Sequence, residues 1–435
     1  MTVSIESLKN CSDSIGIIGL GYVGLPLALA LSNHFSVIGF DLSQKIIDAL
    51  LSGKDPSNEV NDTILANASL TYTHHINDIK DCSIYIVTVP SPIDKNNQPD
   101  LSHIKSATES IEPMINPGNI IIYESTVFPG CTEEICCPIL EQNGLILNKD
   151  FYLGYSPERI SPGDTERTLT KVIKIISASN DYSLSILNHV YGAIIDAGLY
   201  KSPSIKVAEA AKVIENIQRD VNVAFVNELS LIFKHMDINT LDVIDAAASK
   251  WNFMKMYPGL VGGHCIGVDP YYLTYKAQSL GYHPEMILSG RKLNNSMGPY
   301  VAHETIKLCL KHKKSDPTIL IMGLTFKENI SDIRNSKVPD IIDELIQFDA
   351  NIILCDPHAQ EDEVREEYGY TLTDISSVSG IDGIIIAVPH QAYLEKDLNF
   401  FTSKISGPDH EKILIDVKGI FNHHPDREKY AYWVL

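Results

Sequence analysis

The sequence predicts an α/β protein with two doubly wound Rossmann-like domains, joined by a central helical region that contains one long helix. Short runs rich in Ile and Val alternate with patterned segments in the first third of the chain, and the same order returns in the last third. Between them, residues 204–236 contain neither Gly nor Pro. At 435 residues, the chain is long enough for two or three domains.

The first predicted domain spans residues 1–201 and contains a parallel sheet. Its candidate strands are short, apolar and bounded by Gly, Pro, Asp, Glu or Ser, which is typical of strands buried on both faces. The segments between them can supply the crossover helices that parallel strands require. The expected strands are 14–20, 36–40, 83–89 and 119–123.

The second predicted part, residues 202–312, is helical. Ser202 is a candidate N-cap and Pro203 suits the first helical position, so a helix of about 30 residues and roughly 45 Å is expected from there to about Met236. Such a helix can join two domains and offer a dimer surface. Residues 304–310 are expected to belong to another helix.

The third predicted domain, residues 313–435, repeats the α/β order after a polar linker at 311–317. Because any two α/β domains look alike at this level, the repetition predicts a similar architecture and not a duplication. The expected strands are 318–322, 351–355, 383–388 and 412–417.

Composition excludes several classes of protein. The chain is 44% hydrophobic and 21% charged, as expected for a globular protein, and its formal net charge of −20 argues against nucleic acid and an anionic membrane surface as partners. The apolar run 15–31 contains four glycines and follows a segment with only one basic residue, so neither a signal peptide nor membrane insertion is expected.

Eight cysteines in so long a chain predict no disulfide framework, and their spacing predicts no metal site. Most are interpreted as small apolar fillers, and a reducing, cytoplasmic location is expected. They lie at positions 11, 82, 131, 136, 137, 265, 309 and 355.

A dinucleotide-binding motif, Gly-x-Gly-x-x-Gly, begins at Gly19 after the first predicted strand. Its glycines allow a tight turn and the close approach of a pyrophosphate, and the following helix N-terminus favours the phosphates. Asp41, 22 residues after Gly19, can accept hydrogen bonds from ribose hydroxyls and would repel a 2′-phosphate. The motif therefore predicts NAD, in preference to NADP, as the cofactor.

The segment 262–270 holds Cys265 in a glycine-lined turning loop, with Asp269 four residues on. Glycines let backbone approach a ligand closely, so a thiol in this loop can be reached by a substrate. Beside NAD, such a thiol can capture an aldehyde as a thiohemiacetal, which loses a second hydride to become a thioester that water then cleaves. Asp269 can position water or accept a proton, or it can merely cap the segment before Pro270.

Polar residues elsewhere can assist this chemistry. Lys212 and Asn216 share one helix face, either as a solvated surface pair or as donors to an oxyanion. Glu158 is either a turn carboxylate or a general base for thioester hydrolysis, and Thr126 follows a strand end where ligands gather. Phe326, Lys327 and residues 332–334 place cations near a second strand-end crevice, where a nucleotide diphosphate could bind.

Several long motifs resemble the UDP-glucose/GDP-mannose dehydrogenase family, in the family's order and over nearly the whole chain. The residues of these motifs are most similar to those of the branch that oxidises UDP-N-acetylhexosamines for bacterial surface polysaccharides. SPERISPGD and GGHCIGVDPYYL stand where UDP-glucose dehydrogenases have other residues around the matching Glu and Cys. The matching segments are 19–28, 124–134, 155–164, 207–228, 258–273 and 323–336.

The resemblance implies an N-terminal NAD domain, a central dimerisation region and a C-terminal UDP-sugar domain. It also implies a homodimer or larger homo-oligomer with a UDP-sugar substrate. The implied catalytic residues are the nucleophile Cys265, the oxyanion donors Lys212 and Asn216, the assisting Asp269, and Glu158 with Thr126 for hydrolysis. The implied cofactor residues are Gly19, Gly21, Tyr22, Val23, Gly24, Asp41, Thr88, Pro90, Thr126 and Arg334, and the implied substrate residues are Arg159, Tyr257, Gly259 and Lys327.

The leading hypothesis is a four-electron oxidation of the C6 alcohol of a UDP-N-acetylhexosamine, with UDP-N-acetylglucosamine favoured. UDP-glucose, UDP-N-acetylmannosamine and UDP-N-acetylgalactosamine are alternative substrates. A two-electron hydroxyacid-type dehydrogenase would need neither Cys265 nor a third domain, and an NAD-sensing protein would not need Cys265, Lys212 and Asn216 together. Counting the NADH formed per sugar separates these alternatives: two, one or none.

Overall fold

The chain folds into two compact units, each described here by itself. The computed structural model describes residues 3–57, 60–66, 68–160, 164 and 166–435. The first unit contains Met1–Glu215 and Tyr271–Tyr282, and the second contains Asn216–Pro270 and His283–Leu435. The predicted division into three domains at residues 201 and 312 remains a prediction.

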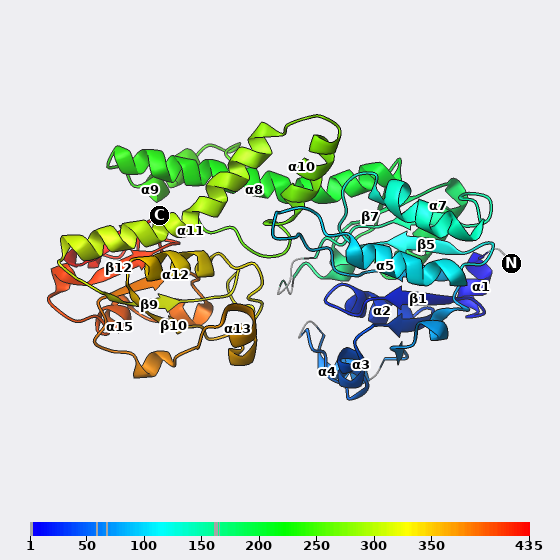
Figure 1. The fold of residues 1–435 in the computed structure, drawn as a ribbon, viewed down its shortest axis with the longest axis horizontal. Helices are drawn as coiled ribbons and strands as arrows, with labels where there is room; N and C mark the ends of the chain where they lie inside the picture. Colours follow the sequence, from blue (N-terminus) through cyan, green and yellow to red (C-terminus); the bar gives the residue numbers. More distant parts are fainter. Residues whose placement is uncertain (1–2, 58–59, 67, 161–163, 165) are drawn as a thin grey trace. The chain divides into compact units, whose positions relative to one another are not determined.

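The first unit is built on an eight-stranded sheet with the order β3-β2-β1-β4-β5-β6-β7-β8 (Figure 1). Its first six strands are parallel and follow the Rossmann order 3-2-1-4-5-6, whereas β7 runs antiparallel to β6. The sequence predicted β1, β2, β4 and β5 but missed the other four. The strands are β1 Ser14–Ile18, β2 Ser36–Phe40, β3 Thr71–Thr73, β4 Ile84–Val87, β5 Ile120–Tyr123, β6 Tyr152–Tyr155, β7 Lys174–Ala178 and β8 Leu199–Lys201.

Helices cover both faces of this sheet. Alternate strand residues such as Ile17, Ile86 and Ile122 pack into one apolar core with α2, α3 and α7. On the other face, the α5 residue Thr108 hydrogen-bonds Tyr123 of β5 at 2.9 Å. The helices are α1 Ile5–Lys9, α2 Gly24–Ser32, α3 Gln44–Leu51, α4 Asp62–Ala66, α5 Ser102–Ile111, α6 Cys137–Leu140 and α7 Asp181–Gly192.

The second unit contains a five-stranded, fully parallel sheet with the order β10-β9-β11-β12-β13. Counted within the unit, this order is 2-1-3-4-5, the other common doubly wound arrangement. The predicted fold class is therefore confirmed, although the two sheets have different strand orders and β13 was not predicted. The strands are β9 Thr318–Met322, β10 Asn351–Cys355, β11 Gly383–Ile386, β12 Ile413–Asp416 and β13 Ala431–Val434.

Helices also cover both faces of the second sheet. The helices α11 and α12 pack with one set of strand residues, and α14 and α15 pack with the alternating set (Figure 1). Burial on both faces explains why these strands read as continuous apolar runs. The helices are α11 Glu285–Lys311, α12 Val338–Gln347, α13 Glu361–Tyr368, α14 Gln391–Leu394 and α15 Leu398–Thr402.

The predicted long helix is α8, Ile205–His235, which has 31 residues and is followed by α9, Thr240–Ala247. The predicted cap was wrong, because the side chain of Ser204, and not that of Ser202, accepts the hydrogen bond from Val207 N at 3.2 Å. Pro203 therefore precedes the cap instead of occupying the first helical turn. The predicted helix at 304–310 is the last part of α11.

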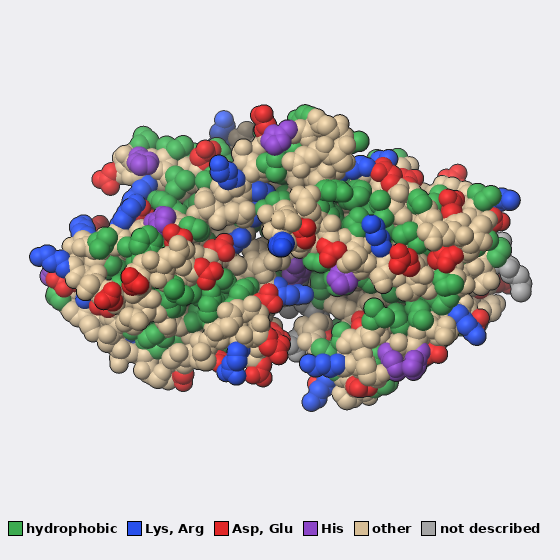
Figure 2. Space-filling model, viewed as in Figure 1, with side chains coloured by type: hydrophobic (Ala, Val, Ile, Leu, Met, Phe, Trp, Pro, Cys, Tyr) green, Lys and Arg blue, Asp and Glu red, His purple; other side chains and the backbone are tan. Residues whose placement is uncertain are grey.

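Charged side chains of both signs are scattered over the visible face of the molecule (Figure 2). In the described part of the chain, no helix is both long enough and apolar enough to cross a membrane. The described residues also contain no cluster of three or more His, Cys, Asp or Glu side chains that could hold a metal ion.

Candidate active site

The glycine motif forms the loop between β1 and α2 in the first unit. Gly19 adopts a φ of +96°, and a Cβ there would lie 3.2 Å from the backbone of Thr88. Gly24 packs even more closely on Gly19 and Thr88. Gly21, in contrast, is exposed, and an added Cβ would meet no described protein atom within 4 Å, which leaves open space for a ligand.

The helix that follows suits an anionic ligand. Tyr22 and Val23 are half-buried, and α2 begins at Gly24 without a side-chain cap. Its N-terminal N–H groups and partial positive charge can therefore bind a pyrophosphate. The residues present thus fit a dinucleotide such as NAD.

Asp41, at the carboxyl end of β2, holds this loop in place. One carboxylate oxygen accepts the N–H of Leu20 at 2.8 Å and the other accepts the N–H of Ser43 at 2.9 Å. Each carboxylate oxygen has about two acceptor positions, so both can still bond a ribose hydroxyl. The carboxylate therefore has spare acceptor capacity, and its contact with the ribose remains a prediction.

The loops after β4 and β5 lie at the same carboxyl edge. Thr88 does not present its hydroxyl outward, because Oγ1 donates to the backbone oxygens of Gly19 at 2.7 Å and Ile18 at 3.0 Å. Pro90 is exposed and Thr126 is half-buried. Thr88 therefore stabilises the glycine loop, and a contact between its hydroxyl and the cofactor remains a prediction.

Glu158 follows β6 and is held by its own loop. Its Oε1 accepts the N–H groups of Arg159 at 2.6 Å and Ile160 at 2.7 Å. The guanidinium of Arg159 bonds the carboxylate of Glu215 on α8, with Nη2 at 2.8 Å from Oε1, and donates to the backbone oxygen of Ile173 at 2.8 Å. Residues 161–163 of this motif lie outside the described part of the chain.

A buried carboxyl group on α8, Glu209, was missed by the sequence analysis. It accepts the N–H groups of Gly130 at 2.5 Å and Thr132 at 2.9 Å, and its burial raises its pKa to about 7. These backbone groups lie at the end of the loop that carries Thr126. One turn further along α8, Lys212 is also buried, with 6% of its surface exposed. A surface pair of Lys212 and Asn216 is thus excluded, since Asn216 is 3% exposed.

Asn216 and Asp269 meet in the second unit. The Asn216 side-chain amide donates to the Asp269 carboxylate, and its oxygen accepts from Arg219. Asp269 is 1% exposed and begins α10, Asp269–Ser279. An amide nitrogen carries two hydrogens, so this bond uses only one of the two donors of Asn216.

Cys265 lies in the run of turns that leads into α10. Its backbone oxygen accepts the N–H groups of Val268 at 3.1 Å and Asp269 at 2.9 Å, and its side chain is half-buried. Gly263 has a φ of +82° and donates its N–H to Asn335 at 3.1 Å. A Cβ on Gly263 would lie 2.7 Å from the Phe326 ring. The space beside this glycine is therefore filled by the Phe326 ring and not, as predicted, by a ligand.

The loop after β9 carries a charge cluster that includes Arg334. Its guanidinium bonds both oxygens of Asp332, at 2.9 and 2.6 Å. Although burial raises the pKa of Asp332, the bonds and charge of Arg334 outweigh burial and lower it. His264, beside Cys265, lies 3.4 Å from Asp332 and meets the Phe326 ring edge-on. The sequence analysis singled out both segments but did not predict this pairing of His264 with Asp332, which ties the cysteine loop to the cluster.

Tyr257 and Gly259 lie on the segment before the cysteine loop. The hydroxyl of Tyr257, which is 44% exposed, donates to Asp245 at 3.3 Å. Gly259 exchanges two backbone hydrogen bonds with the Asn227 amide, at 2.8 and 3.0 Å. Lys327 is half-buried after β9. Asn227 is a buried anchor of the Gly259 segment that no local pattern in the sequence indicates.

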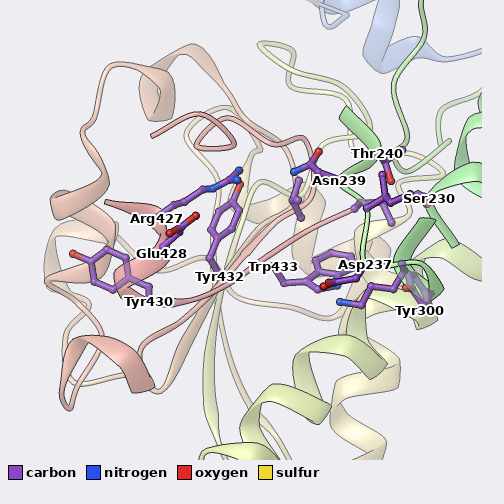
Figure 3. Close-up of a pocket in the computed structure, with 14 residues that line it drawn as sticks. Ser230, Asp237, Asn239, Thr240, Tyr300, Arg427, Glu428, Tyr430, Tyr432 and Trp433 are labelled. Atoms are coloured by element: carbon purple, nitrogen blue, oxygen red, sulfur yellow. The ribbon is translucent and has the colours of Figure 1, made fainter. Parts of the chain in front are cut away.

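A cavity of about 470 Å³ lies elsewhere in the second unit (Figure 3). It is bordered by the end of α8, the start of α9 and the edge strand β13, with Trp433, Tyr432 and Arg427 among the described lining residues. None of the described residues that line it was predicted to be a site residue. It is therefore separate from the predicted chemistry.

Comparison with known proteins identifies the family. Residues 13–195, 206–296 and 320–423 match, in order, the NAD binding, central and UDP binding domains of the UDP-glucose/GDP-mannose dehydrogenase family. Protein CapL of Staphylococcus aureus is 46% identical over 426 residues, covering 97% of this chain and 99% of that protein. The chain belongs to this dehydrogenase family.

Two further relatives refine the comparison. The UDP-N-acetyl-D-glucosamine 6-dehydrogenase of Pseudomonas aeruginosa is 50% identical over 383 residues, which cover 87% of this chain and 91% of that enzyme. The solved structure of the UDP-D-ManNAc dehydrogenase of Pyrococcus horikoshii superposes with a TM-score of 0.86 at 26% identity, covering 97% of this chain and 98% of that one. The dehydrogenase described here is therefore an NAD-dependent oxidoreductase that acts on a UDP-sugar, as predicted.

Proposed function

We propose that this dehydrogenase oxidises the C6 alcohol of a UDP-N-acetylhexosamine to the uronic acid, for surface polysaccharide biosynthesis. UDP-N-acetylglucosamine is the favoured substrate. The similarity to the Pseudomonas aeruginosa enzyme, at 50% identity, supports the sugar class and this preference. UDP-N-acetylmannosamine is the second candidate, because the Pyrococcus horikoshii dehydrogenase shares the fold.

The exposure of Cys265 carries the proposed mechanism. Six of the seven other cysteines, all in the described part of the chain, are buried, and Cys11 is exposed beyond the end of α1. Cys265 alone among the cysteines combines intermediate exposure with a backbone hydrogen bond to Asp269, whose carboxylate accepts the Asn216 amide. A thiol in this setting can be reached by an aldehyde while neighbouring groups stay fixed.

The proposed reaction removes four electrons in two steps. The glycine loop of the first unit would hold NAD, which when bound would supply a hydride acceptor for each of the two oxidations at C6. The Cys265 sulfur adds to the intermediate aldehyde, and the resulting thiohemiacetal is oxidised to a thioester. Water then forms a bond to the thioester carbon, the C–S bond breaks, and the electron pair returns to the Cys265 sulfur. The products are the acid and a free thiol.

Other residues stabilise charge and move protons. The Lys212 ammonium and the remaining N–H of Asn216 are suited to stabilise the alkoxide and the tetrahedral oxyanions. Asp269 fixes the orientation of the Asn216 amide. Glu158 accepts a proton from the hydrolytic water, and Thr126 holds that water. Gly21, the α2 N-terminus and Asp41 would hold the pyrophosphate and ribose of the cofactor.

A homodimer or larger homo-oligomer is part of this proposal. The α8 side chains of Phe225 and Ile232 are 55% and 46% exposed, and Met236, the residue after the helix, is 58% exposed. The spacing of seven residues puts Phe225 and Ile232 on one side of the helix, where they begin an apolar stripe. Burial of this stripe against a second copy would remove it from water. Light scattering of the wild-type chain and of a Phe225→Glu variant tests this part.

A substrate panel with product counting tests the function. UDP-N-acetylglucosamine, UDP-N-acetylgalactosamine, UDP-N-acetylmannosamine, UDP-glucose and GDP-mannose are compared by kcat/KM under one set of conditions. We expect the highest value with UDP-N-acetylglucosamine and two NADH per sugar. A best value with UDP-glucose or GDP-mannose would overturn the sugar class. One NADH per sugar, with aldehyde as the product, would overturn the thioester mechanism.

A further inference from the structure

Three polar side chains from different parts of the first unit converge behind Glu158. Lys174 begins β7, Glu124 follows β5, and Tyr191 lies on α7. The exposed fractions of these side chains are 4% for Lys174, 0% for Glu124 and 11% for Glu158, while Tyr191 is fully buried. None of the three neighbours of Glu158 was singled out in the sequence for chemistry.

Short contacts join the cluster. The Lys174 ammonium lies 2.9 Å from Glu124 Oε2, 3.5 Å from the backbone oxygen of Pro157 and 3.7 Å from Glu158 Oε2. The Tyr191 hydroxyl donates to the other Glu124 oxygen at 2.5 Å. The ammonium also lies 5.2 Å from the centre of the Tyr191 ring. Glu124 and Tyr191 thus fix the position of the lysine.

The cluster contains one cation and two carboxyl groups. Burial by itself lowers the pKa of Lys174, but Glu124 and Glu158 more than offset burial, so that the pKa is raised and the ammonium persists. Burial raises the pKa of Glu124 despite the lysine. Removing one partner of such a buried group would leave the other uncompensated. The position of this buried cation therefore matters for both carboxyl groups.

The two oxygens of Glu158 have different surroundings. Oε1 accepts two backbone N–H groups and is thereby locked. Oε2 has no hydrogen-bond partner among the described residues, and the nearby charge that the structure gives it is the Lys174 ammonium. One oxygen is thus anchored while the other retains its capacity to accept a proton. This arrangement suits a general base.

Among the described residues, three other polar groups near Glu158 have partners of their own. Arg159, its neighbour in the loop, pairs with Glu215 of α8. Glu124 pairs with Lys174, and Tyr191 pairs with Glu124. Lys174 is the cation that faces the Glu158 carboxylate at ion-pair distance.

We propose that Lys174 is a positioning residue that holds the Glu158 carboxylate oriented to accept a proton from the hydrolytic water. This inference rests on the thioester mechanism proposed above. In the step concerned, a water proton moves to Glu158, the water oxygen bonds the thioester carbon, and the C–S bond breaks. Lys174 contacts neither the substrate nor the cofactor in this proposal and acts through Glu158.

A Lys174→Met variant separates this role from simple packing, because methionine keeps most of the volume and removes the charge. An opposite charge within about 4–6 Å typically lowers a carboxyl pKa by about 1–3 units. The acidic limb of the pH profile for acid release should therefore move upward by about 1–3 pH units. Below the shifted limb, NADH should form in a burst of two per active site, followed by slow turnover while the thioester accumulates on Cys265.

Three controls accompany the measurement. Lys174→Arg keeps the charge and should restore the wild-type pH profile. Lys171→Met removes an exposed charge three residues away and should leave the profile unchanged. Should Lys174→Met fail to fold, the double variant Lys174→Met/Glu124→Gln removes one charge of each sign and keeps the readout. Its profile should also be shifted upward.

Two outcomes would overturn the inference. One is a wild-type pH profile in Lys174→Met or in the double variant, even with a lower rate at every pH. The other is an equal loss of the first oxidation and of hydrolysis, without a burst. A wild-type enzyme that forms no covalent intermediate on Cys265, observed by mass spectrometry of the intact chain, would instead refute the proposed function. The two failures are thus distinguishable.

Discussion

The two sheets use the same local device at their first strand, but with different results. In both, a glycine of positive φ follows the first strand: Gly19 at +96° and Gly323 at +90°. In both, an aspartate after the neighbouring strand accepts the N–H of the next residue. Asp41 binds Leu20 at 2.8 Å, and Asp356 binds Leu324 at 2.6 Å.

The difference lies in what remains open. Asp41 is half-buried and keeps acceptor capacity, whereas the side chain of Asp356 is 0% exposed and lies 3.1 Å from His390. Asp356 also accepts the N–H groups of Thr325, His358 and Ala359. Where the first loop has the open Gly21, the second has the fully buried Thr325, whose hydroxyl donates to a backbone oxygen at 2.8 Å.

This comparison teaches that strand, glycine and aspartate do not suffice for a dinucleotide site. The first loop leaves backbone and carboxylate free for a ligand, while the second uses its equivalents for internal bonds. A doubly wound unit can thus keep the scaffold of a cofactor site and lose the opening. Point variants in each unit test this division.

Cys265→Ser tests whether the second unit supplies the nucleophile while the first retains the cofactor. A serine hydroxyl is a poor nucleophile unless activated, so acid formation should fall by orders of magnitude. NAD binding, measured by calorimetry, should be unchanged. Near-wild-type turnover to the acid would show that Cys265 is not the nucleophile.

Lys212→Ala tests charge stabilisation from α8. Loss of one oxyanion donor typically costs about 10²–10³-fold in rate, so kcat should fall by this factor with little change in KM. Steady-state kinetics with the preferred UDP-sugar provide the measurement. A change confined to KM would assign Lys212 to ground-state binding instead.

Asp356→Asn tests the buried, internally bonded aspartate of the second unit. Burial tends to raise the pKa of Asp356, but His390 and the backbone N–H groups outweigh it and lower the pKa to about 2. A depressed pKa stabilises the fold above the ordinary value of 3.8, and this stabilisation is lost as the pH falls towards 2. The variant should therefore lose about 2 kcal/mol at pH 7 and lose less as the pH approaches 2.

Urea unfolding of Asp356→Asn and of the wild type at several pH values provides the check. Asp41→Asn is the matched control, because its carboxylate makes two backbone bonds and remains half-buried. Equal destabilisation of the two variants would mean that the bonds of the Asp356 carboxylate stabilise the fold no more than those of Asp41.

Asp41→Asn tests the half-buried aspartate of the first unit as a determinant of cofactor choice. Its carboxylate favours a free ribose hydroxyl over a 2′-phosphate, so the preference for NAD over NADP should narrow by about tenfold, or 1.4 kcal/mol, in kcat/KM. Asp356→Asn should leave this ratio unchanged. If neither variant changes the ratio, cofactor choice depends on other residues.

Local patterns predicted the framework of both units. The strands 36–40, 318–322 and 351–355 agree residue for residue with β2, β9 and β10, because buried parallel strands are short apolar runs with sharp ends. The missed strands β3 and β8 have three residues each, too few for a period to appear. The antiparallel β7 begins with a lysine, which reads as a solvated residue until its partner is known.

Contacts between distant residues explain what the sequence could not predict at the site. Lys174 and Glu124 are 50 positions apart, and Asn216 and Asp269 are 53 apart. The periodicity of a local segment cannot predict such pairs, because only the fold brings these residues together. The motifs predicted which residue types carry the chemistry. They did not reveal that Thr88 bonds the glycine loop or that Gly263 packs on Phe326.

The path of the chain has a consequence for its synthesis. All eight strands of the first sheet are complete at Lys201, yet the first unit also contains Tyr271–Tyr282. Tyr272 is fully buried there, and its hydroxyl donates to Pro92 at 3.1 Å. Since chains emerge from the ribosome N-terminus first, the cofactor unit stays unfinished while residues 216–270 are made. The cysteine loop therefore leaves the ribosome before the nascent chain can complete the unit that binds NAD.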